Sequence, residues 1–184
     1  YSIFYRPSLF WFAFRLPQIF WQIRNDPLRA MGEYFDLDFP VHRVSAFREY
    51  IGHLNFPYLN EKINEQRKKV DIYLKGLDGI PGVRPIVELP RTKASYPYLA
   101  LIFNDRQKRD LTLHTFRDSG LGISQVYLRS ITDYAYLKDI IPAADCPNSR
   151  LLAERTITLS TSSFLKETDL ENIIKKLKKI ASGR

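Results

Sequence analysis

Side chains that could carry chemistry are few in this chain and lie far apart. The single cysteine, Cys146, stands before Pro147 at the start of an expected helix, where the helix dipole could activate a thiol. A plain structural thiol is the simpler interpretation. The three histidines, His42, His53 and His114, are too scattered to predict a metal site. The sequence also lacks a glycine-rich phosphate loop, a C-x-x-C pair and a serine in a nucleophile-elbow context.

Positive charge is the clearest bulk property of the chain, with a formal net charge of +8. The basic clusters at residues 67–69 and 175–179 fall on the polar faces of expected amphipathic helices. Such clusters are typical of solvated helix faces, and no nucleic-acid-binding motif accompanies them. We therefore expect no nucleic-acid partner. The lone cysteine excludes an internal disulfide and favours a reducing compartment, so we expect a cytoplasmic protein.

Residues 1–40 are expected to form an aromatic, helical appendage. Arg6, Pro7, Arg15 and Pro17 interrupt its apolar stretch, so it does not provide the ~20 clean apolar residues of a transmembrane helix. A helix this rich in aromatic residues must cover its own domain, a missing domain, a partner subunit or a membrane surface. Protein contact is the favoured interpretation, and a membrane surface the less favoured one.

Residues 41–184 are expected to form one α+β domain, with a small, mostly antiparallel sheet covered by helices. Hydrophobic spacing predicts helices over residues 44–54, 60–77, 105–119, 148–154 and 170–180. It predicts strands over residues 96–103, 122–128 and 156–159. Thr168 and Glu171 are spaced as a capping box for the last helix.

Three segments carry a resemblance to a known family. The first is Cys-Pro at 146–147, followed by a short helix, a buried strand and a capped last helix. The second is Val-His-Arg-Val-Ser at 41–45, before a long helix with a basic cluster. The third is Gly-Ile-Ser-Gln-Val-Tyr at 122–127. In this order they resemble the C-terminal end of the DegT/StrS-type nucleotide-sugar aminotransferases, over about residues 28–182.

The resemblance implies a fold, a cofactor and partners. The fold would be the C-terminal domain of a fold-type I aminotransferase, within a homodimer. Pyridoxal phosphate would be bound by a lysine of a missing N-terminal large domain, and a keto-sugar nucleotide and glutamate would be the substrates of the full-length parent. The resemblance implies cofactor-binding roles for Arg43 and His42 and a substrate-binding role for Tyr127. From the residues alone, Arg43 could instead pair with a carboxylate and Tyr127 could be a core strand residue.

Several positions depart from the pattern of the family. Val41 replaces an asparagine that resembles a contact to the cofactor phosphate of a neighbouring subunit. Val126 replaces a histidine before Tyr127, and Ser160 replaces a proline after the third strand. These changes are compatible with two alternatives: the parent acts on a different substrate from its relatives, or it has lost catalytic activity. The alternative function is a non-catalytic interaction domain that docks on a protein or membrane surface.

Overall fold

The computed structural model describes residue 9, residues 11–30, residue 32 and residues 41–183. The expected appendage of residues 1–40 is thus described only in part. A π-helical turn (Trp11–Arg15) leads into α1 (Leu16–Ile23), and α2 (Pro27–Ala30) follows. Pro17 stands in the first turn of α1. Helices thus cover residues 11–23 and 27–30, and the role of residues 1–40 as an appendage stays a prediction.

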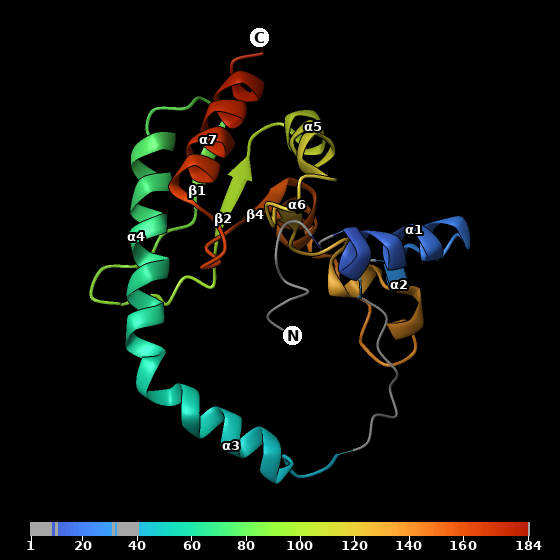
Figure 1. The fold of residues 1–184 in the computed structure, drawn as a ribbon. Helices are drawn as coiled ribbons and strands as arrows, with labels where there is room; N and C mark the ends of the chain where they lie inside the picture. Colours follow the sequence, from blue (N-terminus) through green and yellow to red (C-terminus); the bar gives the residue numbers. More distant parts are fainter. Residues whose placement is uncertain (1–8, 10, 31, 33–40, 184) are drawn as a thin grey trace.

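A long helical arm follows residues 41–45. It consists of α3 (Ala46–Asn55), a 3₁₀ turn (Phe56–Tyr58) and α4 (Leu59–Leu77). Ser45 begins α3 by accepting a hydrogen bond from the N–H of Arg48 at 3.4 Å. Figure 1 shows α3 extending away from the remainder of the molecule, whereas α4 runs along its side. The predicted helices over residues 44–54 and 60–77 are confirmed.

A small antiparallel sheet lies at the centre of the domain, with strand order β1-β2-β4-β3. The strands are β1 (Val83–Pro85), β2 (Tyr98–Phe103), β3 (Ser124–Gln125) and β4 (Thr156–Ser160). The central strands β2 and β4 pair with Leu99 opposite Leu159 and Leu101 opposite Ile157. The predicted fold class, an α+β domain with a small, mostly antiparallel sheet, is confirmed.

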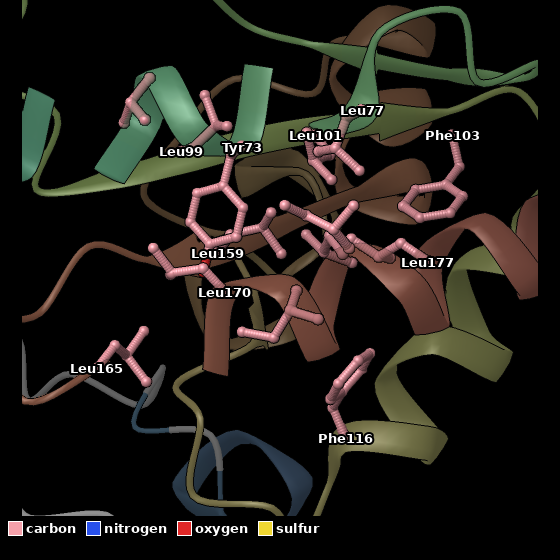
Figure 2. Packing of buried hydrophobic residues seen from close by; sticks show 14 residues of the cluster. Tyr73, Leu77, Leu99, Leu101, Phe103, Phe116, Leu159, Leu165, Leu170 and Leu177 are labelled. Carbon is pink, nitrogen blue, oxygen red and sulfur yellow. The ribbon is translucent and has the colours of Figure 1, made fainter. Parts of the chain in front are cut away.

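The hydrophobic core lies on one face of this sheet. Leu99, Leu101 and Phe103 alternate along β2 and are fully buried. They pack with side chains from α4 and from α7 (Glu167–Ala181), which Figure 2 shows around them. The buried residues contributed by these two helices are Val70, Tyr73, Leu77, Leu170, Ile173, Ile174 and Leu177.

The other two helices are α5 (Arg106–Phe116) and α6 (Pro147–Arg155). Asp105 caps α5 by accepting a hydrogen bond from the N–H of Gln107 at 2.7 Å. Short 3₁₀ turns at Ile131–Asp133 and Ala135–Leu137 lie between β3 and α6. In the part of the chain that the structure describes, no helix combines the length and apolar character needed to cross a membrane.

Two local expectations are wrong, and one strand of the sheet was not predicted. The capping box was placed at Thr168 and Glu171, but α7 begins at Glu167, and Asp169 accepts the hydrogen bond from the N–H of Lys166 at 2.9 Å. The strand expected over residues 122–128 pairs only at Ser124–Gln125. Strand β1 was not predicted, because three residues ending in a proline give no alternating pattern.

Candidate functional site

A pocket opens on the face of the sheet opposite the core. Alternation along β2 points Tyr98 and Ala100 to this face, while Leu99 and Leu101 point into the core. Helix α6 contacts β2 on the same face. The pocket encloses about 410 Å³. Its lining consists of Ile86, Tyr98, Ala100, Val126, Tyr127, Arg129, Ser149, Leu152, Ala153 and Thr156.

Few polar groups interrupt this mainly apolar lining. Among the described lining residues, Arg129 is the only cation, and Ser149 and Thr156 supply aliphatic hydroxyls. Thr156 is only 6% exposed, and its Oγ1 atom has no hydrogen-bond partner in the described part of the chain. A buried hydroxyl without a partner is energetically costly and is normally satisfied by another group. An apolar pocket with one cation and an unsatisfied hydroxyl is typical of a small-molecule site.

The short strand β3 positions Tyr127. The hydroxyl groups of Ser124 and Thr158 lie 2.8 Å apart, which ties β3 to β4 beside the main-chain ladder. The side-chain amide of Gln125 donates to the carbonyl of Tyr127 at 2.7 Å and to the carbonyl of Ala153 at 3.3 Å. Gln125 therefore joins the segment after β3 to α6, and the Tyr127 side chain remains 63% exposed at the pocket.

An arginine clamp fixes the loop between β3 and α6. Arg150 binds both carboxylate oxygens of Asp133 through its Nε, at 3.0 and 2.9 Å, and also donates from Nη1 to Asp145. The hydrogen bonds from Arg150 lower the pKa of Asp133, and the charge of Arg129 contributes in the same direction. Because Arg150 follows the pocket residue Ser149, this clamp holds the loop next to the pocket.

The structure does not bring all the predicted site residues together. Tyr127 lines the pocket, whereas His42 and Arg43 lie in the exposed segment before α3 and are not part of the pocket lining. The neighbouring Val41 is 91% exposed. The proposed roles of all three predicted site residues stay predictions.

The other reactive side chains form no site. Cys146 is a free, half-buried thiol that immediately precedes α6. Within the described ranges, no group of histidine, cysteine or acidic residues is arranged to hold a metal ion.

Sequence reasoning missed most of the pocket. Tyr98 and Thr156 were predicted only as strand residues, and Arg129 follows the quoted segment 122–127 without belonging to it. Polar Thr156 within a buried strand was the available signal, because a buried hydroxyl needs a partner.

The sequence matches the DegT/DnrJ/EryC1/StrS aminotransferase family over residues 42–178. A comparison with curated protein sequences finds no match. The fold is similar to that of several solved structures, among them DesI, TlmJ and Spr1654. In the part of their length that they share with it, these proteins are 15 to 21% identical to the chain.

DesI, solved in the presence of its TDP-sugar product, has a TM-score of 0.61 and 19% identity, with 70% of this chain and 34% of DesI covered. The aminotransferase TlmJ from Streptoalloteichus hindustanus has a TM-score of 0.64 and 21% identity, with coverage of 86% and 46%. The PLP-form of Spr1654 from Streptococcus pneumoniae has a TM-score of 0.67 and 15% identity, with coverage of 88% and 44%. The chain thus spans less than half the length of these proteins. By the match over most of its length, it belongs to the DegT/DnrJ/EryC1/StrS aminotransferase family.

Proposed function

We propose that this chain is the C-terminal part of a cytoplasmic, pyridoxal-phosphate-dependent sugar aminotransferase. The parent transfers an amino group from glutamate to a keto-sugar nucleotide. The family match supports this proposal, as do the TDP-sugar product of DesI and the PLP-form of Spr1654. The observation that carries it within this chain is the pocket with Tyr127 at its edge and an unsatisfied Thr156 hydroxyl at its wall.

The pocket suits a substrate better than a covalently held cofactor. None of the lining residues that the structure describes is a lysine, so these residues offer no amine for a Schiff base with pyridoxal phosphate. When bound to a lysine, this cofactor supplies the electron sink for amino-group transfer. We assign the Schiff-base lysine to the missing N-terminal large domain. The residues of this chain therefore carry out no step of the amino-group transfer.

The pocket residues bind and orient the sugar nucleotide. Arg129 offers a cation to a phosphate group, and the hydroxyl groups of Thr156 and Ser149 offer hydrogen bonds to sugar hydroxyls. Tyr127 contacts the substrate from the exposed edge. His42 and Arg43 contact the cofactor phosphate of the neighbouring subunit in a homodimer.

The exposed face of α3 supports a partner for this chain. Phe47, Tyr50 and Leu54 are 73%, 60% and 46% exposed, and α3 contains no buried residue. An apolar helix face of this size is normally covered by protein. Because α3 lies within the residues that match the family, the proposal assigns this face to the large domain or to the second subunit.

The test is amination of a TDP-linked keto-sugar by the full-length parent, with glutamate as the donor. Thr156→Val removes the unsatisfied hydroxyl without changing the shape of the side chain. Loss of one neutral hydrogen bond, about 1 kcal/mol, should raise the KM for the sugar nucleotide about fivefold and leave kcat nearly unchanged. Thr168→Val, at an exposed position of α7, is the matched control and should leave both constants unchanged. Absence of amination, or equal effects of the two variants, would contradict the proposal.

The alternative function, a non-catalytic interaction domain, is favoured by one observation. Residues 11–23 present an exposed apolar face that lies outside the family match. A parent that neither binds pyridoxal phosphate nor aminates a sugar nucleotide would favour this second function.

A further inference from the structure

Arg129 presents a positive charge to the pocket. Its side chain is exposed and belongs to the pocket lining. Among the residues that the structure describes, none forms an ion pair with Arg129. The guanidinium group offers a planar fork of N–H donors that suits a phosphate, but a nearby carboxylate would occupy the same donors. The availability of Arg129 for a ligand therefore depends on the acidic side chains around it.

A tight turn brings one such carboxylate back towards Arg129. The N–H of Asp133 donates to the carbonyl of Ser130 at 2.9 Å, and Ser130 itself is only 2% exposed. A turn of this kind holds its first and last Cα atoms within about 7 Å of each other, so Asp133 lies close to the neighbour of Arg129. Hydrogen bonds from Arg150 are the main cause of the lowered pKa of Asp133, and the charge of Arg129 lowers it further. The Arg129 guanidinium thus lies within electrostatic reach of Asp133.

Arg150 engages this carboxylate and a second one at the same time. Its Nε donates to both oxygens of Asp133, at 3.0 and 2.9 Å, and its Nη2 donates to Oδ1 at 2.9 Å. Its Nη1 donates to Asp145. The Asp133 side chain is 28% exposed, so water screens this ion pair only in part. Arg150 therefore compensates the charges of both acidic residues.

The ion pairs of Arg150 decide what remains for Arg129. Both Asp133 and Asp145 bind Arg150, and Arg129 has no share in either ion pair. Without Arg150, the Asp133 carboxylate would lose the group that engages both of its oxygens. Arg129 is the next arginine that acts on this carboxylate. Asp133 would then compete with a ligand for the guanidinium of Arg129.

We propose that Arg150 is a positioning residue of the pocket, which holds Asp133 and thereby keeps Arg129 free for the diphosphate group of a sugar nucleotide. This role rests on the proposed function, in which the pocket binds a sugar nucleotide. Arg150 is not itself among the lining residues, although the adjacent Ser149 is. It acts on the ligand through Asp133, whereas Arg129 binds the phosphate oxygens directly.

Two variants that break the same ion pair test this role, because they should act in opposite directions. Thymidine diphosphate is titrated into the full-length parent, and its binding is measured by calorimetry. Arg150→Gln releases Asp133 to pair with Arg129 and should weaken binding about three- to fivefold. Asp133→Asn removes the competing carboxylate and should tighten binding about twofold. Weaker binding in both variants would show that the ion pair only holds the loop, and would overturn the proposal.

A double variant and a control separate the effect of charge from that of loop structure. Asp133→Asn combined with Arg150→Gln leaves the ion pair broken but removes the carboxylate, so it should bind thymidine diphosphate at least as tightly as the wild type. Arg106 is the matched control, because it binds Glu154 of α6 at 3.1 Å but is not among the lining residues. Arg106→Gln should leave binding unchanged. A loss that persists in the double variant, or an equal loss in Arg106→Gln, would overturn the proposal.

Substitution of Arg129 itself provides the last comparison. Arg129→Gln should weaken the binding of thymidine diphosphate about tenfold or more, and Arg150→Gln should then cause no further loss. Binding that does not depend on Arg129, or absence of binding, would overturn the proposal. The measurement needs neither pyridoxal phosphate nor amination. A parent that shows the predicted pattern without aminating a sugar nucleotide would contradict the proposed function alone, whereas amination without this pattern would overturn the role of Arg150 alone.

Discussion

Glu88 joins the loop before β2 to α4. Its two carboxylate oxygens accept hydrogen bonds from the guanidinium of Arg67 at 2.9 and 2.8 Å, and the N–H of Ala94 donates to it at 2.7 Å. The hydroxyl of Tyr96 accepts a further hydrogen bond from the N–H of Glu88. The hydrogen bonds from Arg67 and Ala94 lower the pKa of Glu88 from its ordinary value of 4.5 to about 2.

This pKa shift predicts an acid-dependent loss of stability. Because the folded state lowers the pKa, the stabilisation is present above pH 4.5 and is lost as the pH falls from 4.5 towards about 2. Glu88→Gln should therefore be less stable than the wild type at neutral pH, and the gap should narrow in acid. Urea unfolding at a series of pH values measures this. The control Glu171→Gln, at an exposed position of α7, should show the same pH dependence of unfolding free energy as the wild type. A stability difference between Glu88→Gln and the wild type that does not change with pH would contradict the predicted role of Glu88.

Tyr73 makes a buried hydrogen bond within the core. Its side chain is fully buried, and its hydroxyl donates to the carbonyl of Ser160 at 3.2 Å. Burial raises the pKa of Tyr73, so the hydroxyl remains protonated. Tyr73→Phe should lower the free energy of unfolding by about 1 kcal/mol, because the carbonyl loses its donor. The control Tyr98→Phe, at a half-exposed ring, should change the free energy of unfolding little. Urea unfolding measures both variants, and equal losses of stability would contradict a stabilising role for the Tyr73 hydrogen bond.

At the scale of elements, Gly122 controls the approach of β3 to β4. Its φ is +67°, and a Cβ atom there would lie 2.7 Å from the Cβ of Ser160. Gly79 has the same φ, but a Cβ atom there would meet nothing within 4 Å. Gly79→Ala should therefore cost about 1 kcal/mol from the backbone alone. Gly122→Ala should cost about 1–3 kcal/mol more from crowding, as measured by thermal unfolding. Equal losses of stability in Gly79→Ala and Gly122→Ala would show that the segment before β3 accommodates the added Cβ atom beside Ser160.

Helix α7 contributes much of the core, and Leu177 is among its fully buried residues. Leu177→Ala should lower the free energy of unfolding by about 2–5 kcal/mol, because it removes buried apolar surface and leaves a cavity. Leu111→Ala, at a half-exposed position of α5, should stay within about 0.5 kcal/mol. A loss below about 1 kcal/mol for Leu177→Ala would mean that α7 packs loosely on the sheet.

The sequence predicted those elements whose burial follows a regular period. The continuous apolar run of β2 and the three- and four-residue spacing of Leu170, Ile173, Ile174 and Leu177 were sufficient, because each of these sequence patterns is local. The pocket was not predictable in the same way. Tyr98, Tyr127 and Thr156 are far apart in the chain, and only the order of the strands brings them together. Tyr127 was identified through a resemblance, whereas Thr156 required the structure.

Across the whole molecule, the described residues include two exposed apolar faces, on α1 and α3, and the chain spans less than half the length of DesI, TlmJ and Spr1654. The face of α3 lies inside the family match, and that of α1 lies outside it. We propose that the remainder of the enzyme covers the first.

The visible absorbance spectrum of the full-length parent tests the central claim most directly. The account predicts that pyridoxal phosphate gives the parent a protein-bound absorbance band, that glutamate removes this band, and that a keto-sugar nucleotide restores it. Together these changes report both halves of the amino-group transfer. A parent that acquires no band with pyridoxal phosphate, or whose band does not respond to glutamate, would contradict the account.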